Sequence, residues 1–433
     1  MQPTRQEEHA VMRWDGSCTA VPCTPNRRRQ FNCRPNKAFN CRPNKAHANK
    51  TFFLALVIVM WLAAAPPTPA AGIQPTSRTA LTLVLSQKER AHFDAPSFRL
   101  EERLFADAAD GRLDEFSPLG AALVAGGVDD VDCLRRYEQK AAALVDQLRR
   151  SEKLTDTPRQ QVEAVFEFLH EHVLCGGYDL AYTDLRRVLD DGRFNCVSAT
   201  VLFNYLAGEL GLDCRALEMP GHAMSRVLLP DGPLDVENTY PRWFCCKADS
   251  ERRSDAKSNV VGTLRVPAPH TECADYKGGA AKADRSKARE VSPIQLAAMI
   301  YYNRGVDLLG EKRFADAARA NAKALRLDPA NATARQNLLA TINNWSIELG
   351  NSQHFAEAVD LLRQGLVMDA KFEAFAQNYV HVHHQWVDHL CRQGRFGEAV
   401  EILSRATAEM PDRDYLRKAQ SEVRQRWAKA VGP

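Results

Sequence analysis

Four residues between positions 196 and 237 have the types and the order that thiol chemistry requires. Cys196 follows a glycine-containing turn at the start of a predicted helix, and His222 begins a predicted strand 26 residues later. Asp235 and Glu237 lie on the next predicted strand, and because they are two residues apart their side chains share one face. A thiol nucleophile, an imidazole base and a carboxylate that orients the imidazole make up a catalytic triad. The segment therefore predicts a Cys–His–acid centre.

The position of Cys196 at a helix start bears on its reactivity. Backbone amides and the macrodipole at a helix N-terminus stabilise a thiolate, an effect that is absent from the middle of a helix. The Cys196 N–H is also the natural donor to an oxyanion, and the sequence identifies no second donor. The alternative is that Cys196 is a small buried residue at the helix start, a common role for a free cysteine. The preceding Asn195 is interpreted as a helix cap.

Hairpin register distinguishes between the two acids. A two-residue turn at Asp231-Gly232 pairs Arg226 with Glu237 and places His222 on the same face, four residues further along its strand. At about 3.3 Å per residue this separation is too long for contact, and Asp235 lies further still. Glu237 is therefore predicted as the orienting acid, with Asp235 as its alternative. In this register the triad needs a β-bulge or a wider loop.

The elements that must position these residues follow from the hydrophobic pattern. Residues 97 to about 174 are predicted to be helical, and the clearest helix has Thr157 as its N-cap and Pro158 as its first residue. A short helix at 183–189 precedes the helix at 194–212 that carries the cysteine. The period then changes to two, which predicts strands at 213–219, 222–229 and 234–240. The predicted fold class is α+β, with the cysteine-bearing helix packed on a small antiparallel sheet.

An internal repeat occupies the C-terminal part of the chain. Residues of the same type recur 41 positions apart, among them Phe314, Phe355 and Phe396, then Ala317, Ala358 and Ala399, then Trp345, Trp386 and Trp427. Each copy places a small residue and an aromatic where two helices must pack closely, which predicts stacked helix pairs over 292–430. The preceding residues 247–291 are rich in Lys, Arg, Asp, Ser, Ala and Gly and are interpreted as a polar linker.

The N-terminal 72 residues differ in character from the rest of the chain. Residues 52–65 are an apolar run of fourteen, shorter than the roughly 20 residues of a membrane-spanning helix, with basic residues before it and small residues after it. This layout is typical of a secretory signal peptide at 51–72; an uncleaved signal anchor and a buried core helix are the alternatives. Residues 1–50 contain FNCRPNKA twice in tandem and are interpreted as a disordered or mis-annotated leader. Export to the periplasm or cell envelope is therefore predicted.

Composition and charge exclude several classes of protein. The chain has 433 residues, 45% of them apolar and 26% charged, which argues against a collagen, a wholly disordered chain and a polytopic membrane protein. Residues 1–71 carry ten Lys and Arg against three Asp and Glu, so the remainder is slightly acidic despite the net charge of +3. Such a body does not predict nucleic-acid binding. The twelve cysteines show no paired CxxC spacing, so neither a metal site nor a cofactor is predicted.

Residues 160–244 resemble the transglutaminase-like, papain-related enzyme core. In that family the nucleophile begins a helix (here NCVSATVLF), the histidine begins a strand (here GHAMSRV) and the acid precedes a threonine (here VENT, residues 236–239). Two positions depart from the family pattern, because Met224 replaces the usual tryptophan and Glu237 the usual aspartate. The C-terminal copies resemble the tetratricopeptide repeat, although their period is longer than the usual 34 residues. Helices, then this core, then such repeats resemble the bacterial SirB1-related proteins.

The resemblance implies a transglutaminase-like domain at 97–246 that acts as a cysteine hydrolase or acyltransferase on amide bonds of a peptide or protein. Cys196 would attack the carbonyl, His222 would transfer the proton, and the thioester would pass to water or to an amine. The repeats would bind the peptide or protein partner, and the membrane would be contacted only through the N-terminal apolar segment. The alternative is a non-catalytic interaction protein with a degenerate core, in which only the repeats bind.

Overall fold

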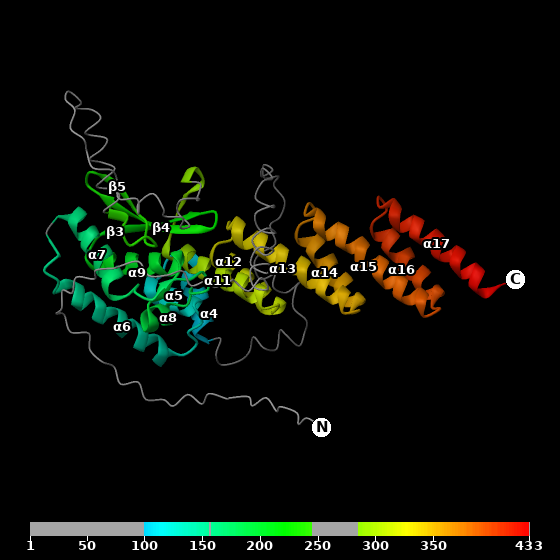
Figure 1. Cartoon of the computed structure of the whole chain (residues 1–433), viewed down its shortest axis with the longest axis horizontal. Coiled ribbons are helices and arrows are strands. Elements are labelled where there is room, and N and C mark those ends of the chain that lie inside the picture. The colour runs from blue at the N-terminus through cyan, green and yellow to red at the C-terminus, as the bar shows by residue number, and fades with distance from the viewer. Residues whose placement is uncertain (1–98, 156, 245–284, 433) are drawn as a thin grey trace, which may run out of the picture. The chain divides into compact units, whose positions relative to one another are not determined.

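The structure is a computed structural model that describes residues 99–155, 157–244 and 285–432 (Figure 1). The predicted leader, the predicted signal segment and most of the predicted linker lie outside these ranges. None of the helices in the described ranges has the length and apolar character needed to cross a bilayer. Helices flank one main antiparallel sheet, and a helical array follows it, which confirms the predicted α+β fold.

Four α-helices of the described residues lie between Arg99 and His172. They are α4 (Arg99–Asp107), which continues into the 3-10 turn η3 (Ala108–Asp110), α5 (Pro118–Ala125), α6 (Val131–Arg149) and α7 (Pro158–His172). From Leu119 to Ala125, α5 is buried on all sides, so it is a central core helix. α7 begins as predicted, with Thr157 at the N-cap and Pro158 at the first helical position.

Two short strands and a short helix lead into the cysteine-bearing helix. β1 (Gly177–Tyr178) pairs in parallel with β2 (Arg193–Phe194), and α8 (Leu185–Asp191) lies between them in the sequence. α8 begins two residues later than predicted because Asp184 caps it by accepting a hydrogen bond from the Arg186 N–H. α9 (Cys196–Glu209) follows β2 directly and packs on β3 and β4 of the main sheet (Figure 1).

The main sheet has four antiparallel strands in the order β5-β4-β3-β6. They are β3 (Asp213–Met219), β4 (His222–Leu229), β5 (Gly232–Val236) and β6 (Arg289–Val291). The first two strands have their predicted bounds, whereas β5 begins and ends earlier than the predicted 234–240. β6 corrects the interpretation of 247–291 as linker throughout, because its three residues pair with β3. A strand of three residues is too short to show alternation in the sequence.

The hairpin between β4 and β5 has a different register from the predicted one. The turn lies one residue earlier than Asp231-Gly232, because Gly232 already begins β5 with a φ of +122°. As a result, Arg226 pairs with Asp235 and not with Glu237. The Asp-Gly dipeptide correctly indicated a hairpin, but assigning both of its residues to the turn was wrong.

Within the described residues, seven α-helices follow β6 and form three consecutive pairs and a final single helix, α17. They are α11 (Pro293–Gly310), α12 (Phe314–Leu327), α13 (Ala332–Asn351), α14 (Phe355–Met368), α15 (Glu373–Arg392), α16 (Phe396–Glu409) and α17 (Asp414–Val431). The three repeated phenylalanines are the first residues of α12, α14 and α16. The 41-residue period arises because the first helices of the second and third pairs have 20 residues each and the second helices have 14.

The hydrophobic core of the sheet region continues into the first of these helix pairs. α11 packs against α5, α9 and β3, and its buried residues Ile300 and Tyr301 belong to the same cluster as Phe203 of α9. A second cluster joins α12 to α17 and contains Leu338, Leu362 and Leu403. Packing is therefore continuous across residue 292, the predicted start of the repeats. The first helix pair contributes to both cores.

Candidate active site

Cys196 is the first residue of α9, and Asn195 caps that helix. Asn195 Oδ1 accepts a hydrogen bond from the Ser198 N–H at 3.0 Å, and the Asn195 N–H donates to Ser198 Oγ at 3.0 Å, which forms a capping box. Asn195 Nδ2 donates to Thr183 Oγ1 at 2.6 Å and to the Leu180 carbonyl at 3.1 Å, so the cap also fixes the preceding loop. At the first helical position the Cys196 N–H has no acceptor within the helix and is available to an oxyanion.

His222 begins β4 directly after a tight turn. Met219 at the end of β3 pairs with His222, and Gly221 in the turn has a φ of +73°, the left-handed region that favours glycine. His222 Nε2 lies 2.7 Å from Glu237 Oε2. His222 is 4% exposed and Glu237 is 0% exposed, so water has little access to this contact. Two residues 15 positions apart in sequence thus form an enclosed imidazole–carboxylate pair.

Glu237 reaches His222 because it lies just beyond the sheet. β5 ends at Val236, so the Glu237 side chain is released from the alternation of the strand. Its Oε1 accepts hydrogen bonds from the Thr239 N–H at 3.0 Å and from Thr239 Oγ1 at 2.5 Å. Both carboxylate oxygens therefore have partners, and the contact forms without the predicted bulge. Thr239 is a site residue that sequence reasoning noted only as part of the VENT motif.

The environment of His222 favours its protonated form. Burial opposes the imidazolium, but the Cys196 thiol and the Glu237 carboxylate outweigh burial and raise the pKa of His222 to about 9. Nδ1 of His222 is buried and has no hydrogen-bond partner among the described residues. Because Nε2 is held by Glu237, Nδ1 is the ring nitrogen available to exchange a proton with Cys196, which is itself 7% exposed.

Asp235 makes a different contact. Its carboxylate accepts hydrogen bonds from Arg226 Nε at 2.7 Å and from Arg226 Nη2 at 3.1 Å, across the hairpin at the paired position. Of the two acids predicted from the sequence, the structure places Glu237 beside His222 and Asp235 beside Arg226.

Buried polar side chains hold the segment that carries Glu237. Asn238 Nδ2 donates to Ser225 Oγ on β4 at 2.8 Å and to Thr200 Oγ1 on α9 at 3.3 Å. Ser225 Oγ in turn donates to Asn204 Oδ1 on α9 at 2.6 Å. Residues 237–239 are thereby fixed between α9 and the sheet. Sequence reasoning missed this chain, because isolated Ser, Thr and Asn residues in a helix or strand carry no distinguishing pattern.

The other cysteines of the described residues are also free thiols: Cys133, Cys175, Cys214 and Cys391. Burial raises the pKa of Cys214 to about 12, so this thiol is unreactive at neutral pH. Cys175 is exposed. Across the described ranges, no three Cys, His, Asp or Glu side chains gather as metal ligands would. Cys245, Cys246 and Cys273 lie outside these ranges.

Residues 135–240 match a family model described as the transglutaminase-like superfamily. The matched segment runs from α6 to just past β5 and contains Cys196, His222 and Glu237 together with Asp235. No curated protein and no solved structure matches the chain. The sheet region is therefore similar to a transglutaminase-like domain, a fold that can carry a thiol enzyme.

Proposed function

We propose that this protein is a thiol enzyme that breaks or exchanges amide bonds of a peptide or protein, with Cys196 as nucleophile, His222 as base and Glu237 as the orienting acid. The observation that carries the proposal is the enclosed 2.7 Å contact between His222 Nε2 and Glu237 Oε2. The other ring nitrogen of His222, Nδ1, has no hydrogen-bond partner among the described residues, and Cys196 interacts with the same ring. This is the arrangement that a Cys–His–acid centre requires.

The reaction begins with transfer of the Cys196 thiol proton to His222 Nδ1. The sulfur attacks the amide carbonyl, and the Cys196 N–H at the start of α9 donates to the oxyanion that develops. His222 then returns its proton to the departing amine, the C–N bond breaks and a thioester remains on Cys196. Water or a second amine attacks the thioester and gives up a proton to His222. The C–S bond then breaks, His222 passes this proton to the sulfur of Cys196, and an acid or a new amide is released.

Glu237 supports both proton transfers. Its Oε2 fixes the orientation of the ring, and its charge stabilises the imidazolium, whose pKa is raised to about 9. Thr239 donates two hydrogen bonds to Oε1, the other carboxylate oxygen of Glu237. These bonds fix the carboxylate so that Oε2 faces the histidine. The same charge favours the state in which the Cys196 proton has moved to His222, as the first step of the reaction requires.

Two further features belong to the same proposal. The helix pairs from α11 to α16 resemble tetratricopeptide repeats and would bind the peptide or protein partner on the concave surface that stacked helix pairs typically form. The apolar run at 52–65 would direct the chain to the periplasm or cell envelope, with or without cleavage.

Site-resolved alkylation tests the proposal. Iodoacetamide at pH 6 should modify Cys196 at least about ten times faster than the exposed Cys175, because only a cysteine held as a thiolate reacts well below the usual pH. Cys196→Ala should abolish amide cleavage of a peptide library, or incorporation of a fluorescent primary amine into a protein mixture. Cys175→Ala should leave both unchanged. If Cys196 reacts no faster than Cys175 and the Ala variant binds partners as the wild type does, the protein is a non-catalytic repeat protein.

A further inference from the structure

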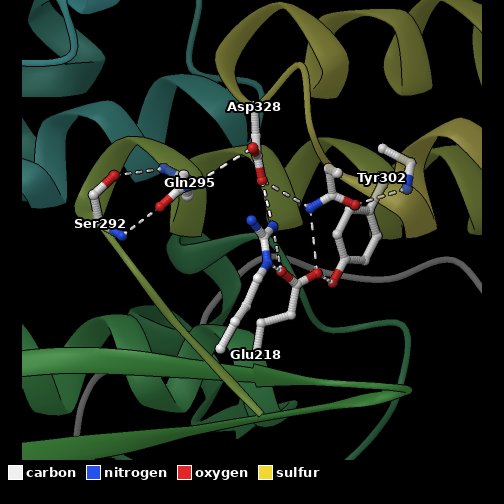
Figure 2. Close-up of polar contacts among 8 residues, drawn as sticks. Glu218, Ser292, Gln295, Tyr302 and Asp328 are labelled. Atoms are coloured by element: carbon white, nitrogen blue, oxygen red, sulfur yellow. Dashed lines mark hydrogen bonds and ion pairs between the residues drawn. The ribbon is translucent and has the colours of Figure 1, made fainter. Parts of the chain in front are cut away.

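A buried polar cluster joins the catalytic sheet to the first helices of the helical array. We define the Glu218 cluster as Glu218 on β3, Arg289 on β6, Tyr302 on α11, and Asp328 and Asn331 between α12 and α13. Figure 2 shows the Glu218 side chain directed from the sheet towards Tyr302 on α11 and Asp328 at the C-cap of α12. Four separate segments of the chain therefore meet at one carboxylate.

Every oxygen of the Glu218 carboxylate is engaged. Oε1 accepts hydrogen bonds from Tyr302 OH at 3.1 Å and from Asn331 Nδ2 at 3.3 Å. Oε2 accepts from Arg289 Nε at 2.8 Å, and Arg289 Nη2 also pairs with the Asp328 carboxylate. Asn331 Nδ2 lies 3.1 Å from Asp328 Oδ2 and closes the ring of contacts.

Because the cluster is buried, each of its polar groups needs a partner within the protein. Glu218 is 6% exposed, Asp328 3% and Asn331 2%, so the loss of one partner would leave a charge or a polar group unpaired inside the protein. A buried ion pair is weak evidence for stability, because desolvation offsets much of the attraction. The same requirement for complete pairing does fix geometry, since few arrangements satisfy every member.

The cluster acts on the turn that carries His222. Glu218 pairs with Ala223 across β3 and β4, and the next pair, Met219 with His222, closes the turn. Fixing Glu218 to α11 and to the loop before α13 therefore fixes the first residues of β4. Burial, the charge of Glu218 and the charge of Cys196 all raise the pKa of Tyr302 well above its usual range.

We infer that Glu218 is a positioning residue for His222, and that Tyr302 of α11 holds it in place, so that the first helices of the array are part of the active centre. The positioning of His222 is a structural inference, whereas its importance for catalysis rests on the proposed function. It predicts that a hydrogen bond supplied by the helical array sets the distance between His222 and Glu237.

The experiment measures the titration midpoint of His222 by NMR with histidine labelled at the ring carbon, assigned by comparison with His222→Gln. Glu218→Gln removes the charge and keeps the shape, while Tyr302→Phe removes one hydrogen bond and changes no charge. The control is Asp369→Asn, which breaks the half-buried pair between Arg335 of α13 and Asp369 after α14. Melting temperatures are recorded for all three variants.

Both cluster variants should lower the His222 midpoint towards the ordinary value, by about half a pH unit or more, because a displaced ring loses its contact with Glu237. Asp369→Asn should lower the melting temperature without moving the midpoint. An unchanged midpoint in folded Glu218→Gln, or a shift in Glu218→Gln with none in Tyr302→Phe, overturns the inference. The second outcome would mean that charge alone acts on His222. A shift in both variants of a protein whose Cys196 is unreactive supports positioning and defeats the proposed enzyme activity instead.

Discussion

Glu237 Oε2 and His222 Nε2 lie 2.7 Å apart in a part of the molecule that excludes water almost completely. Both residues sit at the margin of the sheet, His222 at the start of β4 and Glu237 just after the end of β5. Two residues before Glu237, Asp235 is still within the strand and pairs with Arg226 instead. The two carboxylates are hard to distinguish in the sequence. They have different partners because Asp235 lies within β5 and Glu237 lies just after its end.

Glu237→Gln should reduce turnover by about 10²–10⁴-fold while affecting substrate binding much less, because the amide cannot stabilise the imidazolium. Asp235→Asn should leave turnover within a few-fold of wild type and reduce stability by about 1 kcal/mol, through a weakened half-buried pair with Arg226. Steady-state kinetics and melting temperatures of the two variants check both statements. The assignment of the acid is wrong if Asp235→Asn is inactive and Glu237→Gln is not. Two active variants beside an inactive Cys196→Ala would indicate a Cys–His dyad.

The raised pKa of His222 predicts a specific dependence of stability on pH. The pKa is about 9 in the folded protein against an ordinary value of 6.5, so protonation of His222 favours the folded state. This contribution is complete below pH 6.5 and is lost as the pH rises through 9, and its size is on the order of 3 kcal/mol. Urea denaturation at intervals from pH 6 to pH 9.5 should show the loss in wild type and not in His222→Gln. Parallel curves for the two proteins would contradict the pKa shift.

The positions of Cys196 and His222 at the starts of a helix and a strand could be predicted, because local sequence signals determine where these elements begin. A capping asparagine before Cys196 and a glycine turn before His222 place both residues at element starts, whatever the rest of the fold does. The hairpin register was not predictable in the same way. It depends on whether Gly232 belongs to the turn or begins the strand, and the positive φ of this glycine is compatible with both choices.

Contacts between distant segments could not be predicted from the sequence. Glu218 and Asn331 are 113 positions apart, and Glu218 stands in a strand where an isolated acid is interpreted as a solvent-facing residue. The 41-residue repeat predicted helix pairs correctly but suggested that they form a unit apart from the sheet. The buried residues of α11, Tyr301 among them, show instead that the first pair packs into the same core as α9.

Asp307 on α11 is predicted to destabilise the protein at neutral pH. Burial and the neighbouring carboxylates of Glu311 and Asp179 raise its pKa to about 6, although Arg304 acts in the opposite direction. Because the folded-state pKa lies above the ordinary value of 3.8, stability falls as the pH rises from about 4 to 6 and the full cost remains at pH 7. Asp307→Asn should therefore raise stability at pH 7 by about 1–2 kcal/mol and have little effect at pH 4.

Asp316 on α12 provides the matched control for Asp307. Burial raises its pKa, but the hydrogen bonds from Arg319 and Arg313 prevail and lower it overall. Its contribution to stability is thus present above the ordinary value and is lost as the pH falls through the lowered one. Asp316→Asn should destabilise the protein at pH 7, opposite in sign to Asp307→Asn. Two variants that shift the denaturation midpoint in the same direction at pH 7 would refute the pKa assignments.

Gly365 on α14 is predicted to be irreplaceable for packing, whereas Gly208 on α9 is not. A Cβ added at Gly365 would lie 2.7 Å from the ring of Phe375, which is fully buried on α15 and cannot move aside. Gly365→Ala should therefore destabilise the protein by about 1–3 kcal/mol. A Cβ at Gly208 would meet nothing within 4 Å, so Gly208→Ala should stabilise α9 by a few tenths to about 1 kcal/mol. Urea denaturation of both variants at pH 7 gives the two free energies, and an unchanged or raised stability of Gly365→Ala would show that α14 and α15 can separate to admit a methyl group.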